Sequence, residues 1–296
     1  MRKIKIAVIS DIHGNSEALK AAILDAQKNN VDEYIFPGDL VNDLPFGNET
    51  LEIIKNTSNY IIEGNKEEYL KEYNKSQYTW PNLQFNNVKF MYKELTKENL
   101  DFIFKLPVNL NLEFEGVKFK VVHGSPKSIE EQIHKVDEDL INNYANSLEE
   151  DVLIFAHSHE QVWNRNINGK LLVNVGCAGV SPYYLSKAEY VILHINNKKV
   201  EVEKRLVPYD LSIVKNKIEK CGILKFDKVL MSLTYSALAG NGKIRHQFFI
   251  EAKEEMEKRH HNLYRPDAKG IYKYFKLYDD DIWLSLYNKY KQYFEF

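Results

Sequence analysis

Short apolar segments that end abruptly in polar clusters constrain this chain more than any other feature. Ile4–Ser10 runs into Asp-Ile-His, Glu33–Phe36 runs into Pro-Gly-Asp, and Tyr60–Ile62 runs into Glu-Gly-Asn. Between them, Ser16–Lys28 and Phe46–Lys55 have apolar residues spaced by about 3.6 positions, which predicts helices. This alternation of strand, loop and helix indicates an α/β fold.

The same pattern continues further along the chain. Val117–Val122 leads into His-Gly-Ser, Val152–Phe155 into Ala-His-Ser-His, and Leu171–Val173 into Asn-Val-Gly. Tyr190–Ile195 and Val200–Val207 predict an antiparallel hairpin that turns at two asparagines. Because buried strands fix the loops that follow them, the polar clusters in those loops are candidate ligand-binding groups.

The pattern changes near Pro208, where strand-like segments give way to helical ones. We therefore predict an α/β domain over residues 1–208 and a helical C-terminal extension over residues 209–296. The extension would be a cap, an intrachain brace or a contact for a homo-oligomer. Residues 73–95 form an aromatic-rich insertion, which would either line a substrate cleft or form a small hydrophobic cluster.

Composition excludes several classes of protein. The 296 residues carry 40 basic and 42 acidic groups, a formal net charge of -2, which disfavours binding to long nucleic acids or to an anionic membrane surface. The two cysteines, Cys177 and Cys221, give neither a disulfide framework nor a zinc-ligand spacing. The apolar run at the N-terminus is too short for a signal peptide, and no stretch approaches the roughly 18 apolar residues of a membrane span. We expect a cytoplasmic protein without a membrane partner.

The first three clusters contain oxygen and nitrogen ligands of the kinds that bind metal ions. Asp11 and His13 are separated by one residue, so both can turn from a short loop toward one point. Asp39 follows Gly38, and each of its two carboxylate oxygens could hold a different cation. Asn65 offers a neutral amide oxygen. Taken singly, each cluster is also an ordinary turn sequence.

The later clusters supply histidines. His123 follows one predicted strand, and His157 and His159 follow another. A lone histidine at a strand end is usually structural, but residues two apart in extended backbone face the same side, so the pair could serve one centre. Ligands at five successive strand ends make a metal centre the better interpretation.

The order DxH, GD, GN, HG and HxH resembles the calcineurin-like metallophosphoesterases, particularly their small bacterial and archaeal phosphodiesterase branch, and it spans about Lys3–Tyr209. The resemblance implies an α/β fold with a four-layer αββα sandwich of two mixed sheets flanked by helices, here with a helical C-terminal appendage. It also implies two divalent transition-metal ions, manganese first, with iron, zinc or nickel as alternatives. One ion would be held by Asp11, His13, Asp39 and His159, and the other by Asp39, Asn65, His123 and His157.

The resemblance further implies hydrolysis of phosphodiesters or phosphoanhydrides in small nucleotide-type substrates, by attack of a metal-bridging hydroxide. Charge counting supports this independently. Two divalent cations add four positive charges, Asp11 and Asp39 remove two and a hydroxide removes one, which leaves a centre that attracts phosphate. We expect Asn65, Lys66 and His123 to act in catalysis, and Asn65 and Lys66 also to contact the substrate.

Lys66 departs from the family, because many relatives have histidine after Gly-Asn to protonate the leaving group or bind phosphate. A lysine is a poor proton donor at neutral pH but a good fixed cation. We therefore hypothesise a preference for leaving groups that need little protonation, such as nucleoside polyphosphates or aryl phosphodiesters. The alternative is that Lys66 points into solvent, and its neighbour Glu67 is interpreted as a first-turn helix residue.

Three other functions stay open from sequence alone. A eukaryotic retromer subunit resembles this fold with a degraded site, so a non-catalytic metal-binding scaffold is one alternative. A nuclease and a protein phosphatase are the others. Five histidines match no family ligand position, and we expect them to be structural or surface residues: His134, His194, His246, His260 and His261.

Overall fold

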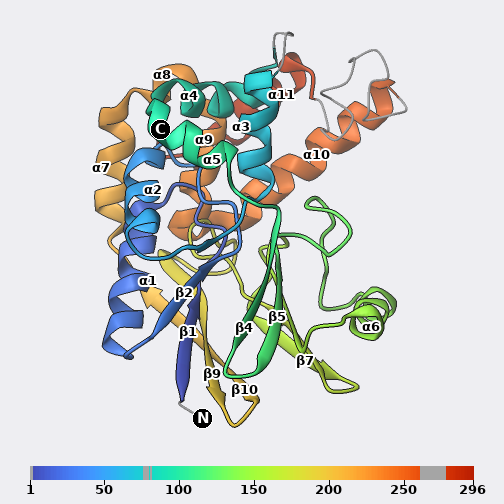
Figure 1. Ribbon diagram of the computed structural model, residues 1–296. Coiled ribbons are helices and arrows are strands. Elements are labelled where there is room, and N and C mark those ends of the chain that lie inside the picture. The colour runs from blue at the N-terminus through green and yellow to red at the C-terminus, as the bar shows by residue number, and fades with distance from the viewer. Residues whose placement is uncertain (1–2, 76–79, 81, 261–277) are drawn as a thin grey trace.

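The computed structural model describes residues 3–75, 80, 82–260 and 278–296 and contains two five-stranded mixed sheets (Figure 1). The first sheet has the order β10-β9-β1-β2-β3. Its strands are β1 (Ile4–Val8), β2 (Glu33–Phe36), β3 (Tyr60–Ile61), β9 (Lys187–Asn196) and β10 (Lys199–Pro208). β1, β2 and β3 are parallel, with Val8 beside Ile35, whereas β9 and β10 run antiparallel.

The second sheet has the order β4-β5-β6-β8-β7. Its strands are β4 (Asn109–Phe114), β5 (Val117–Val122), β6 (Val152–Phe155), β7 (Trp163–Ile167) and β8 (Lys170–Asn174). β5, β6 and β8 are parallel, and the antiparallel edge strands β4 and β7 close the sheet. These two edge strands were absent from the sequence prediction, because their polar, half-exposed residues give a weak apolar signal.

The hairpin of β9 and β10 confirms the sequence prediction with a shift of one residue at its turn. Asn197 and Lys198 occupy the turn with φ of 50° and 61°. Positive φ at both central residues is typical of the tight turns that match the twist of a hairpin.

Helices cover the outer faces of both sheets. α1 and α2 pack on the first sheet, and α6 packs on the second, which confirms the predicted four-layer sandwich (Figure 1). The helices before β9 are α1 (Ser16–Lys28), α2 (Gly47–Lys55), α3 (Asn65–Lys75), η1 (Leu83–Phe85), α4 (Asn86–Glu94), α5 (Lys97–Phe104) and α6 (Glu138–Ser147). The C-terminal region adds α7 (Leu211–Cys221), α8 (Ile223–Phe226), α9 (Lys228–Ser236), η2 (Ala237–Asn241), α10 (Gly242–His260), α11 (Asp280–Tyr290) and η4 (Lys291–Tyr293).

Alternation along the strands builds separate apolar cores on the two faces of each sheet. Ile6 and Val8 of β1 face the second sheet and pack in one cluster with Phe119 of β5. Ala7 points the opposite way and packs in another cluster with Leu19 of α1. All five side chains are completely buried, and each large aliphatic or aromatic one contributes about 1.5 to 3 kcal/mol. The two cores fix the strands and therefore the loops that follow them.

The aromatic insertion belongs to the main core. Trp80 and Phe85 are buried in the same cluster as Leu70 of α3 and Met91 of α4, beside the first sheet. The hydrophobic interpretation therefore holds for these side chains, although residues 76–79 and 81 lie outside the described residues. Phe85 also lines a cleft, which is discussed with the site below.

The C-terminal helices pack against the carboxyl ends of the first-sheet strands (Figure 1). Leu44, which follows β2, and Val180, which follows β8, share an apolar cluster with Val214 and Ile218 of α7. These contacts are all within one chain. The predicted boundary at residue 208 and the predicted homo-oligomer contact both stay predictions.

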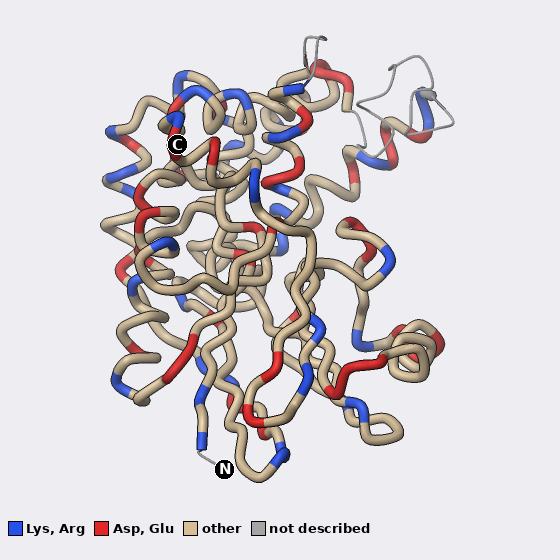
Figure 2. The backbone as a smooth tube through the Cα atoms, in the orientation of Figure 1, with Lys and Arg blue, Asp and Glu red and all other residues tan. Residues whose placement is uncertain are grey.

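Charges are mixed over the whole surface. Basic and acidic residues intersperse along the helices, and Figure 2 shows no extended basic stripe among the described residues. No helix in the described part of the chain is both long enough and apolar enough to cross a membrane.

Candidate metal centre

The seven predicted ligands come from loops at the carboxyl ends of strands in both sheets. Parallel strands of one sheet end at one edge, and packing the sheets face to face brings their two edges together. Asp11 and His13 follow β1, Asp39 follows β2, Asn65 follows β3 at the start of α3, His123 follows β5, and His157 and His159 follow β6. All of them are buried except His159, which is partly exposed.

Four side chains form the first of two groups. His13 Nε2 lies 2.9 Å from His159 Nε2 and 3.6 Å from Asp39 Oδ2. His159 Nε2 lies 3.1 Å from Asp11 Oδ1. The ligand atoms of these four residues lie within 4.8 Å of one another.

The second group shares Asp39 with the first. His123 Nε2 lies 3.4 Å from Asp39 Oδ1 and 3.1 Å from Asn65 Oδ1. Ligand atoms of Asp39, His123 and His157 again lie within 4.8 Å of one another. The two carboxylate oxygens of Asp39 therefore face different groups, as a bridging ligand would.

Partners on the outer side of the imidazoles orient them toward these groups. His123 Nδ1 is 2.8 Å from Pro37 O, and His157 Nε2 is 3.3 Å from Glu130 O. A backbone carbonyl only accepts, so in the neutral imidazole, the form that binds a metal, the facing nitrogen carries the proton and the other nitrogen presents its lone pair to the centre. This is the usual arrangement around metal-binding histidines.

The donor set fits divalent cations. Asp11 Oδ1 is buried without a properly oriented hydrogen-bond donor, and the Nε2 atoms of His13 and His159 face each other. The amide of Asn65 also turns one atom toward both oxygens of Asp39, at 3.0 and 3.1 Å. A bound cation would remove the repulsion between lone pairs that converge on one point. Four imidazoles with carboxylates suit borderline transition metals better than magnesium.

The backbone at the ligands is itself unusual. Five of the seven predicted ligands have positive φ: Asp11, His13, Asp39, His157 and His159, with values from 50° to 66°. Residues other than glycine rarely adopt this conformation, which costs on the order of 1 kcal/mol or more at each position. Its concentration here marks a region whose geometry is held by the surrounding structure.

The close packing of these charged side chains also shifts their pKa values. Burial works against the charged form of His123, but the carboxylates of Asp39 and Asp11 outweigh it and raise the pKa of His123 to about 9. Burial, reinforced by the positive charge of His123, lowers the pKa of His157 to about 4. Burial also opposes ionisation of Asp39, yet His123 and His13 hold the pKa of its carboxyl well below the usual range. The carboxylates are therefore poised to bind cations.

Two glycines allow the Asp39 loop to approach the Asn65 loop. Gly38 has φ of 90°, and a Cβ on it would collide with the backbone of Gly64. A Cβ on Gly64 would collide with the side chain and backbone of Asp39. Gly38 therefore permits a tight turn that brings the backbone close to the site.

Glu67 has a role that sequence reasoning missed. Its side chain is completely buried and accepts hydrogen bonds from Leu40 N and Val41 N on one oxygen, at 2.9 and 3.0 Å, and from Gly64 N on the other, at 2.8 Å. Burial and the neighbouring Asp39 raise the pKa of Glu67 to about 8. Glu67 therefore ties together the loops that carry Asp39 and Asn65.

Asp43 was also missed, although it lies only four residues after Asp39. Its Oδ2 is 3.4 Å from His13 Nδ1, on the outer side of that imidazole, without the geometry of a hydrogen bond. Its two oxygens also contact Lys66 Nζ at 3.5 Å and Arg245 Nη2 at 3.4 Å. A carboxylate in the stretch Leu-Val-Asn-Asp-Leu, directly after the Asp39 cluster, was the available signal.

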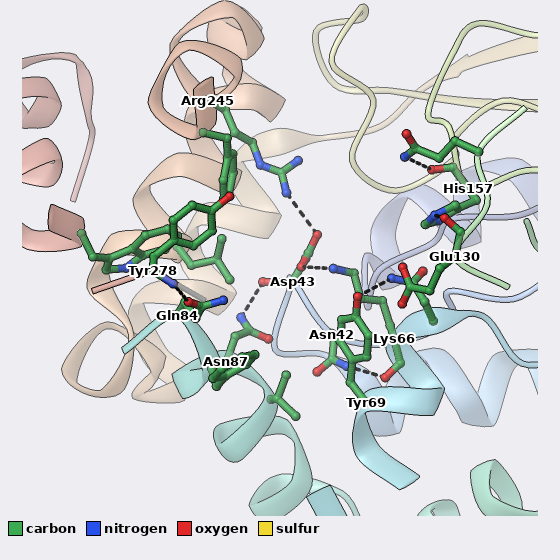
Figure 3. Close-up of a pocket in the computed structure, with 17 residues that line it drawn as sticks. Asn42, Asp43, Lys66, Tyr69, Gln84, Asn87, Glu130, His157, Arg245 and Tyr278 are labelled. Carbon is green, nitrogen blue, oxygen red and sulfur yellow. Dashed lines mark hydrogen bonds and ion pairs between the residues drawn. The ribbon is translucent and has the colours of Figure 1, made fainter. Parts of the chain in front are cut away.

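A cleft opens beside these residues (Figure 3). Asn65, Lys66 and His157 from the metal centre line one part of it, and Arg245 and Phe249 of α10 line another. Lys66 lines the cleft instead of projecting away from it, with 23% of its side chain exposed. His246, expected to be a surface residue, is exposed and lines an adjoining pocket over Asp39 and His159.

Two of the remaining histidines pair with carboxylates, and Cys177 is buried. His134 pairs with Glu160, and His194 pairs with Glu203. The side chain of His260 and all of His261 lie outside the described residues. Cys177 is completely buried, and burial raises the pKa of its thiol, which agrees with a packing role.

A family model for the calcineurin-like phosphoesterase superfamily domain matches residues 4–198. The chain belongs to this family. Membership indicates metal-dependent hydrolysis of phosphoesters, and it confirms the resemblance seen in the order of the polar clusters. The matched span contains all seven predicted ligands and ends within the β9–β10 hairpin.

Similar proteins agree on the fold. Uncharacterized protein MJ0912 of Methanocaldococcus jannaschii is 27% identical over 74% of this chain and 94% of its own length. The crystal structure of hypothetical protein PH1004 from Pyrococcus horikoshii has a TM-score of 0.68 at 22% identity, covering 80% of this chain and 98% of that one. A metallophosphoesterase from Sphaerobacter thermophilus has a TM-score of 0.64 at 21% identity, covering 79% and 98%.

Proposed function

We propose that this chain hydrolyses phosphodiesters or phosphoanhydrides of small nucleotide-type substrates with two divalent metal ions, manganese foremost. The observation that carries the proposal is the pair of ligand groups that share Asp39, one oxygen facing each group. Paired cations about 3.5 to 4 Å apart are the usual requirement for metal-assisted phosphoryl chemistry.

In this proposal Asp11, His13, Asp39 and His159 hold one ion, and Asp39, Asn65, His123 and His157 hold the other. When bound, the two ions would activate water and neutralise negative charge on the phosphoryl group. The protein supplies the rest. Outer carbonyl acceptors orient His123 and His157, and a backbone held by buried strands keeps the ligands in place before any cation arrives.

Lys66 would act as a fixed cation toward the substrate. Burial lowers the pKa of Lys66, but the carboxylates of Asp43 and Asp39 outweigh it, and the net shift is upward. A lysine that stays charged attracts phosphate oxygens and donates no proton to a departing alkoxide. Substrates whose leaving group needs little protonation, such as polyphosphates or aryl phosphodiesters, fit this site.

Hydrolysis of bis(p-nitrophenyl) phosphate by metal-stripped protein resupplied with manganese tests the proposal. We expect manganese-dependent turnover that Asp39→Asn lowers by about a thousandfold, since several kcal/mol of charge stabilisation is lost. Asp139→Asn, on an exposed position of α6, is the matched control and should keep full activity. No turnover of this ester or of a nucleotide panel, despite two bound metals, would favour a non-catalytic scaffold.

A further inference from the structure

The cleft beside the metal centre extends under the C-terminal helices and encloses a volume of about 480 Å³. Such a volume is in the range of small-molecule sites. One end is formed by Asn65, Lys66 and His157, and the other by side chains of α10, α11 and η1. The family match ends at residue 198, so the α10 and α11 parts of this second wall come from outside the matched domain.

Arg245 reaches the cleft because α10 begins close to the loop that follows β8. A Cβ on Gly242, the first residue of α10, would lie 2.6 Å from Pro182 O, so the helix start and this loop are in close contact. Three residues later Arg245 extends its guanidinium toward Asp43, between α10 and the metal-centre loops (Figure 3).

Lys66 and Arg245 converge on Asp43 from opposite sides (Figure 3). Both contacts are long, at 3.5 and 3.4 Å, and use one nitrogen of each cation. Arg245 Nε is buried with no hydrogen-bond partner among the described residues. A guanidinium has five N–H donors and an ammonium has three, so most of these donors stay available to a ligand.

Asp43 also sets the distance of the two cations from the metal centre. Its Oδ2 touches both His13 Nδ1 and Arg245 Nη2, at 3.4 Å each. One carboxylate, Asp43, and one imidazole, His13, thus lie between the cations and the predicted metal centre. One substrate with two phosphoryl groups can span this distance, with one group at the metal centre and the other at the cations.

Two carboxyl groups lie on the walls of the cleft and reduce its positive charge. Asp43 is already shared by two cations, and burial raises the pKa of the carboxyl of Glu130, the other acidic group. Glu130 lies on the side of the cleft opposite Arg245 (Figure 3). The positive end of the cleft therefore consists of Lys66 and Arg245.

The far end of the cleft is aromatic. Phe249 lies one helical turn after Arg245, whose guanidinium carbon is 5.7 Å from the ring centre. Phe85 and Trp283 complete this wall, and the indole N–H of Trp283 has no partner among the described residues. An apolar ring system with a polar edge, such as a nucleobase, matches a wall of this kind.

We propose that Arg245 and Lys66 form a subsite for a second phosphoryl group, next to the one that reacts, and that the C-terminal extension thereby selects nucleoside polyphosphates. This inference rests on the proposed function for the identity of the reacting phosphoryl group. Arg245 is the specificity-determining residue, since a planar guanidinium can bind two phosphate oxygens at once.

Calorimetric titration of manganese-loaded protein with AMP and with α,β-methylene ADP measures the contribution of the second phosphoryl group directly. In Arg245→Gln we expect the preference for the diphosphate over AMP to fall by about tenfold to a hundredfold. Turnover of bis(p-nitrophenyl) phosphate, which has one phosphoryl group, should fall by a smaller factor than the preference for the diphosphate does. Arg245→Lys should restore part of the preference, because it keeps the charge without the bidentate geometry.

Lys253→Gln is the matched control, since Lys253 is a half-exposed cation on the same helix, away from the cleft. An unchanged preference for the diphosphate in Arg245→Gln would overturn the subsite. Equal losses with AMP, diphosphate and bis(p-nitrophenyl) phosphate would also overturn it, by showing that Arg245 acts through Asp43 on the metal centre. Absence of turnover in the wild type, with a preference that still depends on Arg245, would reject the proposed hydrolase and keep the subsite.

Discussion

The metal-centre loops and the α10 wall of the cleft, formed by Arg245 and Phe249, differ in how their side chains are held in place. The loops present buried side chains on strained backbone, and their imidazoles are oriented by acceptors behind them. The α10 wall presents Arg245 and Phe249, two partly buried side chains on one regular helix. A substitution in the loops disturbs many contacts, whereas one on the helix changes a single surface of the cleft.

This difference suggests how the two regions divide the work. Strand ends held by two cores can keep ligand atoms at fixed distances, which metal chemistry requires. A helix face can exchange side chains without moving the centre, which suits selection among substrates. Changes to the loops should therefore affect every substrate, and changes to the α10 wall should affect only some.

Glu67→Gln should give the largest effect, because it alters the group that ties the Asp39 and Asn65 loops together. The new amide NH₂ would meet the N–H of Gly64 or those of Leu40 and Val41, leaving donors without an acceptor. We expect manganese affinity to fall about tenfold to a hundredfold and turnover of all substrates to fall together. Equilibrium dialysis with metal analysis measures the first effect.

Glu68→Gln, at the next and only partly buried position, is the control for that change. If Glu67→Gln bound manganese as tightly as the wild type, the assignment of Glu67 as a positioning residue would be wrong. If Glu67→Gln lowered turnover of polyphosphates alone, the proposed difference in role between the metal-centre loops and the α10 wall would be contradicted.

Lys66→His should give a smaller effect that depends on the substrate, because Lys66 lies where the two regions meet. A histidine can protonate a departing alkoxide at neutral pH, whereas lysine cannot. We expect the ratio of alkyl to aryl phosphodiester turnover to rise about tenfold. An unchanged ratio, measured with a dialkyl phosphodiester and bis(p-nitrophenyl) phosphate, whose leaving groups are an alkoxide and an aryloxide, would count against Lys66 as the cause of the preference.

Asp25→Asn should give the smallest effect, on stability alone, because it lies outside both regions. Asp25 accepts from Arg205 Nε and Nη2 at 2.9 and 2.8 Å and from the Tyr190 hydroxyl at 2.7 Å, which joins α1 to the β9–β10 hairpin. The Arg205 hydrogen bonds lower the pKa of Asp25. We expect a loss of about 1 kcal/mol in the free energy of unfolding at pH 7, with unchanged turnover.

The pH dependence of that loss has a definite sign. A depressed pKa in the folded state stabilises the protein above the unfolded value, about 3.9, and the contribution disappears as pH falls through the lower folded value. Urea unfolding of wild type and Asp25→Asn should therefore differ at pH 7, and the difference should shrink below about pH 4 and vanish once the pH is below the folded pKa of Asp25. Asp101→Asn, whose partner Lys97 is an exposed neighbour on α5, should show no measurable difference at either pH.

The spacing of apolar residues in the sequence was sufficient to predict most of the helices and strands that support the site. α1 was predicted at its observed bounds, and β2, β5 and β6 likewise, because their apolar residues alternate or run continuously against a buried face. The edge strands β4 and β7 were missed because one side of each pairs with nothing and faces solvent. Ligand types were readable for a related reason, since a polar cluster after a buried strand stands out against its surroundings.

The sequence by itself indicated an α/β fold and proposed the seven ligands, because strand-like segments and the polar clusters after them can be read locally, whereas the four-layer sandwich was implied by the family resemblance. Only the tertiary structure brought Arg245 to Asp43 across about two hundred residues and showed that Glu67, in the first turn of α3 as predicted, also links two loops. Such contacts depend on how separate helices and loops pack, and packing leaves no periodic trace in the sequence. The shape of the cleft, and with it the choice of substrate, was therefore decided by the fold.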